Sequence, residues 1–225
     1  MERRGFLVGA AALAGSARPP IDASDRAERT RLILLGTGGG PRPRKASSAS
    51  AQVIVARNGA YVVDCGNGVA RQLVFAGVPL DTLHDESVKV TAAVVHHPPV
   101  VPALAYRFDA ADRSIVISGD TTPCDALVKL AQGADVLVHS ALYVPAVDRL
   151  VARVPNASTL KQSIIAHQTS AEDAGRAAQA AGAKTLVLSH LVPADDPEVT
   201  EQMWIDAART HFHGPIIVGR DLLEI

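Results

Sequence analysis

Short apolar runs alternate with polar, glycine-bearing segments along the chain, and this spacing predicts alternating strands and helices. Runs rich in Val, Ile and Leu are typical of strands, and longer Ala-rich or periodic runs are typical of helices. Strands are predicted over residues 32–35, 52–56, 61–63, 88–95, 104–108, 114–117, 136–139, 185–188 and 216–218. Helices are predicted over 69–76, 125–131, 170–181 and 197–212. Poor periodicity over 145–165 predicts a long loop.

The helix over 170–181 carries signals at both of its ends. Ser170 with Asp173 forms a variant of the capping box, and Gly182 follows the Ala-rich stretch as a C-terminal stop. A buried strand, a helix and a last strand follow. The alternation of strands and helices therefore predicts an α/β protein.

The first 17 residues, MERRGFLVGAAALAGSA, are set apart from the fold. The Arg3-Arg4 pair, a short apolar run and small residues up to Ala17 resemble a twin-arginine export signal, with cleavage after Ala17 or after Ala14. The run is too short for a permanent membrane span, and no second stretch approaches membrane length. We expect a periplasmic or extracellular protein without stable membrane insertion, formed by one domain over residues 18–225.

Length and composition indicate how large a core the chain can form and which partners its charge would attract. With 225 residues, 48% of them hydrophobic, the chain is long enough for one domain with a sizeable core. The formal net charge of -1 gives no overall attraction to nucleic acid, so we expect a small-molecule substrate or ligand and no nucleic acid partner. Two cysteines, Cys65 and Cys124, do not make a disulfide framework.

The glycine-rich segment Gly36-Thr-Gly-Gly-Gly40 follows the first predicted strand. A dinucleotide-binding turn needs a further glycine and a helix that begins at once, whereas Pro41 and Pro43 follow here. Two interpretations remain open: a tight loop that borders an active site, and a glycine turn without a ligand.

Four polar residues end apolar runs in the second half of the chain: His97, Asp120, His167 and His190. Strand ends present such side chains to a cleft, which is how a metallohydrolase distributes its ligands. Between Gly36 and His96 the sequence holds a single histidine, His84, so half of a two-metal ligand set is missing.

The order LGTGGGP, VVDCGNG, HHPPVVPALAYRF, SGDTTP, HQTSAEDAG and LVLSHLVP resembles the metallo-β-lactamase superfamily, specifically its ribonuclease Z and arylsulfatase-like branch. The resemblance implies an αββα sandwich with two metals, usually zinc, in a cleft along the sheet edges. It further implies that His97 binds the first metal, Asp120 bridges both, and His190 binds the second. His167 matches a histidine that transfers a proton or stabilises charge, and His139 matches a position near the site that is not a ligand.

The chain departs from this family pattern at one place. The family has a His-x-His-x-Asp-His segment after the equivalent of Gly77-Val-Pro-Leu80, whereas this sequence runs directly into Val88. The resemblance therefore implies an internal deletion of several dozen residues, which removes three ligand histidines and an aspartate.

Three ligands divided between two former sites predict at most one weakly bound zinc. Two functions then compete. The first is a metal-dependent hydrolase of ester, phosphodiester or sulfate bonds with weak activity, in which Asp120 and His167 are catalytic. The second is a non-catalytic remnant or ligand-binding module of the same fold. Loss of a strand and its covering helices also predicts low stability or a homo-oligomer that buries the exposed surface.

Overall fold

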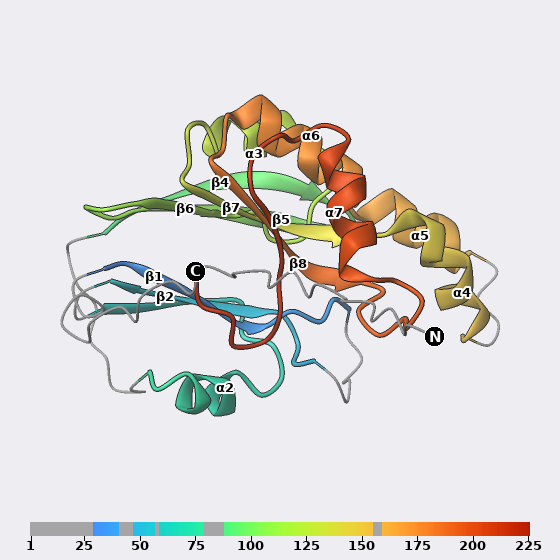
Figure 1. Ribbon diagram of the computed structural model, residues 1–225, viewed down its shortest axis with the longest axis horizontal. Helices are drawn as coiled ribbons and strands as arrows, with labels where there is room; N and C mark the ends of the chain where they lie inside the picture. The colour runs from blue at the N-terminus through green and yellow to red at the C-terminus, as the bar shows by residue number, and fades with distance from the viewer. Residues whose placement is uncertain (1–28, 41–46, 57–58, 79–87, 155–158) are drawn as a thin grey trace, which may run out of the picture.

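The computed structural model describes residues 29–40, 47–56, 59–78, 88–154 and 159–225, which form two stacked β-sheets between helices. Helix α2 (Val69–Phe75) lies on the outer face of the first sheet. Helices α3 (Asp125–Leu130), α6 (Ala171–Ala181) and α7 (Glu201–Arg209) lie on the outer face of the second (Figure 1). This arrangement is the predicted αββα sandwich. Among the described residues, no helix is both long and apolar enough to cross a membrane.

The first sheet contains three antiparallel strands in the order β1 (Arg31–Gly36), β2 (Ala51–Ala56) and β3 (Gly59–Val63). The C-terminal tail covers the outer edge of β1, because Leu32 and Ile225 exchange two backbone hydrogen bonds of 3.2 and 2.9 Å. In the described part of the chain, no strand pairs with the outer edge of β3.

The second sheet has six strands that follow one another in sequence order. Its antiparallel half contains β4 (Lys89–His97), β5 (Val100–Asp109) and β6 (Ser114–Ile117). Its parallel half continues from β6 through β7 (Val136–Leu142), β8 (Thr185–Val192) and β9 (Ile216–Val218). Strands β4, β6, β7 and β8 therefore run in the same direction, and their carboxyl ends meet at one edge of the sheet.

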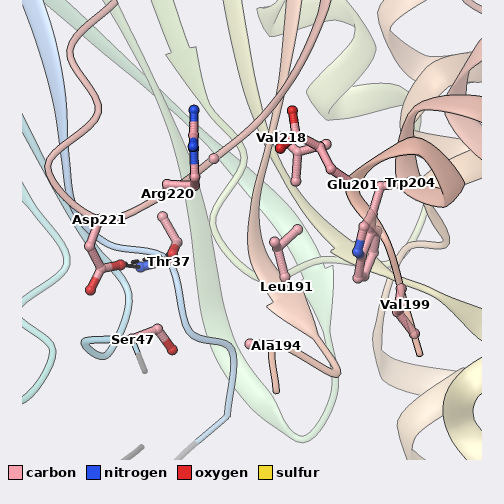
Figure 2. A pocket seen from close by; sticks show the side chains of 11 residues that line it. Thr37, Ser47, Leu191, Ala194, Val199, Glu201, Trp204, Val218, Arg220 and Asp221 are labelled. Atoms are coloured by element: carbon pink, nitrogen blue, oxygen red, sulfur yellow. Dashed lines mark hydrogen bonds between the residues drawn. The ribbon is translucent and has the colours of Figure 1, made fainter. Parts of the chain in front are cut away.

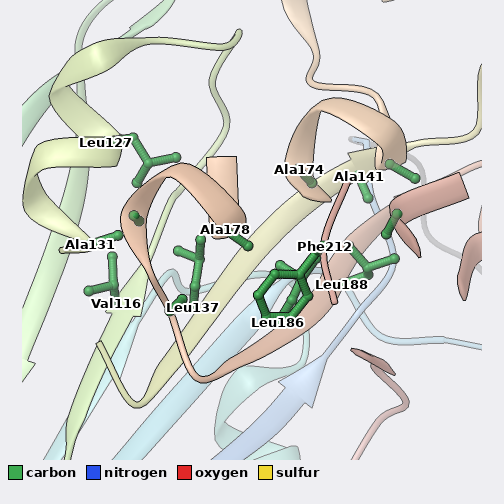
Figure 3. Close-up of a cluster of buried hydrophobic side chains, with 14 of the residues drawn as sticks. Val116, Leu127, Ala131, Leu137, Ala141, Ala174, Ala178, Leu186, Leu188 and Phe212 are labelled. Atoms are coloured by element: carbon green, nitrogen blue, oxygen red, sulfur yellow. The ribbon is translucent and has the colours of Figure 1, made fainter. Parts of the chain in front are cut away.

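The main hydrophobic core lies between the second sheet and its helices (Figure 3). Helix α6 buries Ala171, Ala174, Ala178 and Ala181, a spacing that places small side chains on one helix face. A second apolar cluster, which includes Ile54 and Val138, fills the space between the two sheets. The sandwich is thus held together by continuous apolar layers on both faces of the second sheet.

Most predicted elements are confirmed, with two corrections in the second half of the chain. The long loop predicted over 145–165 is wrong for the described residues, which form a 3-10 turn (Val144–Ala146), α4 (Val147–Ala152) and α5 (Leu160–His167). The helix predicted over 197–212 is shorter, because Thr200 caps α7 by accepting a hydrogen bond from the Met203 amide. The export segment 1–17 and His84 lie outside the described residues.

Candidate active site

The shared edge of the second sheet brings three of the predicted site residues together. His97 is the last residue of β4, Asp120 follows the end of β6, and His190 lies near the end of β8. Because these strands run in the same direction, their ends place the two histidines on either side of Asp120. We call these three residues the outer cluster.

Asp120 lies between the two histidines. Its Oδ2 is 3.9 Å from Nε2 of His97, and its Oδ1 is 3.2 Å from Nδ1 of His190. The side chains of His97, Asp120 and His190 are 18%, 33% and 14% exposed, so solvent reaches the cluster from one side.

A backbone contact orients His97. Its Nδ1 lies 2.8 Å from the carbonyl oxygen of His167 and donates to it, because a carbonyl can only accept. The neutral ring then carries its lone pair on Nε2, the nitrogen that faces Asp120. A histidine held in this way is oriented as metal-binding histidines are.

The glycine-rich loop fixes the other histidine. The Gly40 amide donates to Nε2 of His190 at 3.3 Å, so the neutral ring carries its proton on Nδ1. This nitrogen lies 3.2 Å from Oδ1 of Asp120 but makes no hydrogen bond with it. A side chain at Gly39 would lie 2.9 Å from Nδ1 of His190, so only glycine allows the loop this close. Of the two interpretations of this segment, the structure supports a close-packed loop that borders the site.

His167 reaches the outer cluster from a helix rather than from a strand end. It is the last residue of α5, so the expectation that it ends a strand is wrong. Its ring centroid lies 6.4 Å from that of His97, and its Nδ1 lies 3.3 Å from the Ser163 hydroxyl one turn earlier. This contact involves Nδ1 and so leaves Nε2 as the ring nitrogen that could act on a substrate.

Asp64 is a site residue that the sequence reasoning did not select. It directly follows β3 with a left-handed φ of 59° and faces Asp120 and His190 from the first sheet. Although solvent reaches this side chain, surrounding atoms remove much of its water and raise the pKa of Asp64. The Asp120 charge raises this pKa further, and His190 lowers it. A carboxylate directly after an apolar run, in VVDCG, was the available signal.

Two further histidines near the edge have other roles. His96 faces away from His97 and contacts the Thr122 hydroxyl at 3.1 Å. His139 is fully buried, and its Nδ1 donates to the Ser140 carbonyl at 2.8 Å. Burial lowers the pKa of His139 to about 4, so it is a neutral core residue near neutral pH. Cys65 and Cys124 are both free thiols.

The outer cluster does not fit a two-metal centre. In the ranges that the structure describes, no three His, Cys, Asp or Glu side chains are arranged to hold a metal ion. Nε2 of His97 and the Asp120 carboxylate offer lone pairs, whereas the lone pair of the neutral His190 ring accepts from the Gly40 amide. These residues therefore fit one weakly held ion at most, because structural and catalytic zinc sites use three or four protein ligands.

A larger cavity of about 410 Å³ lies near the carboxyl end of β8 (Figure 2). Leu191, the neighbour of His190, contributes to its apolar floor together with Trp204, and Thr37 and Ser47 line the opposite wall. Arg220 borders the cavity, and in the described part of the chain no side chain pairs with its guanidinium. A guanidinium group thus lines this cavity, together with the carboxylates of Glu201 and Asp221.

Comparisons with known proteins show the relationship of this chain. No protein-family model matches it. Ribonuclease Z of Mycobacterium tuberculosis (strain H37Rv) is 33% identical over 194 residues, which cover 82% of this chain and 68% of that protein. Ribonuclease Z of Mycobacterium sp. (strain KMS) is 31% identical over 205 residues, 87% of this chain and 70% of that protein. The chain belongs to the ribonuclease Z family.

Solved structures support the same fold for this ribonuclease Z family chain. The metallo-β-lactamase fold protein YhfI from Bacillus subtilis aligns with a TM-score of 0.68 at 16% identity, covering 87% of this chain and 98% of that chain. The short form of human tRNase Z aligns with a TM-score of 0.57 at 16% identity, over the same shares of both chains. The prediction of a metallo-β-lactamase-like sandwich is confirmed.

The exclusion of nucleic acid partners is wrong. It rested on a net charge near zero, whereas the relatives that share most of this chain are named as ribonucleases. Overall net charge does not exclude RNA binding, because a local group such as Arg220 can contact a phosphate in a chain of balanced charge.

Proposed function

We propose that this chain hydrolyses phosphodiester bonds of RNA at a low rate. The residues that would carry out the reaction are His97, Asp120 and His167. The observation that carries the proposal is the convergence of these three side chains on one sheet edge in a ribonuclease Z family chain. Family membership favours an RNA phosphodiester over the ester and sulfate bonds that the arylsulfatase-like resemblance also allowed.

One zinc ion at most would be held, by Nε2 of His97 and the Asp120 carboxylate. When bound there, a cation lowers the pKa of water and polarises the scissile phosphate. With two protein ligands this ion is held weakly and exchanges readily, which limits the rate.

The residues of the chain supply orientation and proton transfer. The Asp120 carboxylate can accept a hydrogen bond from the attacking water and hold it in line with the phosphorus. The His167 carbonyl keeps the His97 ring in place, and Nε2 of His167 can donate a proton to the leaving oxygen.

Arg220 supplies a contact for the RNA backbone. Its guanidinium can bind a phosphate oxygen bidentately, and the cavity that it borders begins one residue from His190. A phosphate contact of this kind positions the RNA without reading its sequence.

RNA binding without hydrolysis is the competing function. The single histidine between Gly36 and His96 favours it, because the residues that would complete a two-metal centre are absent from the sequence. Both functions use the same cleft, so affinity for RNA alone does not separate them.

Single-turnover cleavage of a transcript that contains a tRNA separates the two functions. We expect slow cleavage that stops after chelation and is abolished by Asp120→Asn, while Asp195→Asn, the same chemical change at an exposed site, leaves the rate unchanged. Binding of the transcript with no Asp120-dependent cleavage would establish the binding function instead. Two tightly held zinc ions with efficient turnover would contradict both.

A further inference from the structure

The cavity near the carboxyl end of β8 has a charged end and an apolar end. Figure 2 shows Arg220 and Glu201 together at one end and Ala194 and Val199 toward the other. Leu191 adds apolar surface between them. The volume of about 410 Å³ lies in the range of small-molecule sites. This shape fits a small molecule with its charges at one end and an apolar body at the other.

Two hydrogen-bond donors in the lining of this cavity have no partner. Oγ of Ser47 is buried and makes no hydrogen bond. Trp204 is only 3% exposed, and within the described ranges its indole N–H has no hydrogen-bond partner. Buried hydroxyl and indole N–H groups usually find a partner in proteins. The two groups therefore indicate an occupant that carries a hydrogen-bond acceptor.

The charged groups of the lining decide which class of molecule fits. Arg220 and Glu201 are exposed, and neither pairs with another side chain in the described part of the chain. Asp221 is already occupied, because its carboxylate accepts from the Thr37 amide and hydroxyl at 2.9 and 2.8 Å and from the Ser48 amide at 2.6 Å. One cation and one anion remain for a ligand. This balance favours a zwitterion, because a simple anion would meet the charge of Glu201.

Hydrogen bonds hold both walls of the cavity in place without a ligand. The contacts of Asp221 fix the wall that Thr37 lines. On the other side, Asp196 accepts from Nε of Arg149 at 2.8 Å and from the Glu198 amide at 3.0 Å, which fixes the loop after β8. A preformed cavity binds a small molecule without the cost of ordering its own walls.

We propose that this cavity binds a free α-amino acid with a branched aliphatic side chain. Such a molecule carries both charges on one carbon atom, from which its apolar side chain extends. Its carboxylate binds Arg220, its ammonium group binds Glu201, and its side chain packs against Leu191 and Val199. The proposal does not depend on RNA hydrolysis, and its test contains no RNA.

Equilibrium dialysis of the full chain against L-leucine tests the proposal. We expect one molecule per chain with a Kd of about 0.1 mM. Arg220→Gln and Glu201→Gln should each weaken binding about tenfold or more, because each leaves one charge of the ligand unpaired. Arg71→Gln makes the same chemical change as Arg220→Gln at an exposed position on α2 and should leave binding unchanged.

Two analogues of leucine assign each charge to its partner. Leucinamide lacks the carboxylate, so only Glu201→Gln should weaken its binding. 4-Methylpentanoate lacks the ammonium group, so only Arg220→Gln should weaken its binding. The absence of saturable leucine binding would show that the cavity holds only water and would overturn the proposal. Leucine binding that neither variant weakens would place the amino acid elsewhere, and tighter binding of 4-methylpentanoate than of leucine would identify a site for organic anions; either result would also overturn it.

Discussion

His139 is a buried residue whose ionisation links stability to pH. Burial lowers its pKa from 6.5 to about 4, while the Ser140 carbonyl and Asp173 raise it slightly. The unfolded chain therefore binds a proton more readily than the folded chain between about pH 6.5 and 4, and unfolding becomes easier as the pH falls through this window. From pH 7 to 5 we expect His139 to contribute a loss of about 2 kcal/mol.

Urea denaturation of the unchanged protein and of His139→Gln at pH 7 and pH 5 measures this contribution. Glutamine keeps a donor for the Ser140 carbonyl and cannot ionise, so the variant should lose correspondingly less stability at pH 5. Equal losses in both proteins would show that other groups cause the acid sensitivity.

His167 and His97 share one contact but have different roles. His167 presents its backbone oxygen to His97, so His167→Ala keeps the hydrogen bond that orients the ring of His97. We expect a roughly 100-fold lower cleavage rate with unchanged metal content, because the side chain acts on the leaving oxygen. Elemental analysis beside single-turnover kinetics measures both quantities. A parallel loss of metal would show that His167 is a ligand.

The sequence predicts the outer cluster better than the approach of Asp64 from the first sheet. His97, Asp120 and His190 each end an apolar run, so strand order alone brings them to one edge. Asp64 also follows an apolar run, but its position next to Asp120 and His190 depends on how the two sheets face each other. Contacts between sheets follow from packing rather than from local pattern.

Among the elements, α5 was missed because it lacks an apolar face. None of its residues is buried, so its sequence has no amphipathic period to detect. Helix α6, in contrast, packs a full face of alanines into the core and was predicted with both ends.

The crossing of α6 and α7 depends on a glycine. A side chain at Gly175 would lie 2.2 Å from the Ala208 carbonyl oxygen, so Gly175→Ala should separate the helices and cost about 2 kcal/mol or more. Gly182 has a left-handed φ of 63° with open space around it, so Gly182→Ala should cost only about 1 kcal/mol. Chemical denaturation of both variants gives this comparison. An equal cost in both would show that the crossing relaxes without penalty.

The N-terminal segment has a predicted role in export that is independent of the fold. The Arg3-Arg4 pair precedes a weakly apolar run, which is the pattern of a twin-arginine signal, so replacement of both residues by lysine should leave precursor in the cytoplasm. Immunoblots of cell fractions measure the result. Unchanged export of the variant would contradict the role of the pair.

At the scale of the molecule, the αββα layers follow from the order of the apolar runs. The exposure of β4, the edge strand of the second sheet, does not follow from that order. Val90 and Val94 of β4 point toward the space between the sheets and are 45% and 64% exposed, since in the described chain no element covers them. This pattern agrees with our proposal that a strand and its covering helices are missing relative to the family.

The uncovered edge of β4 should make the chain self-associate. Residues 90–95 carry no charge, and Val101 at the adjacent start of β5 is 86% exposed, so the edge can pair with a second copy. Sedimentation velocity should show a mass that rises with concentration. Val94→Lys should suppress association without lowering the melting temperature, because a charged edge side chain opposes pairing and remains solvated. Val74→Lys places the same charge on α2 and should leave association unchanged. A monomer at every concentration would show that the edge does not pair.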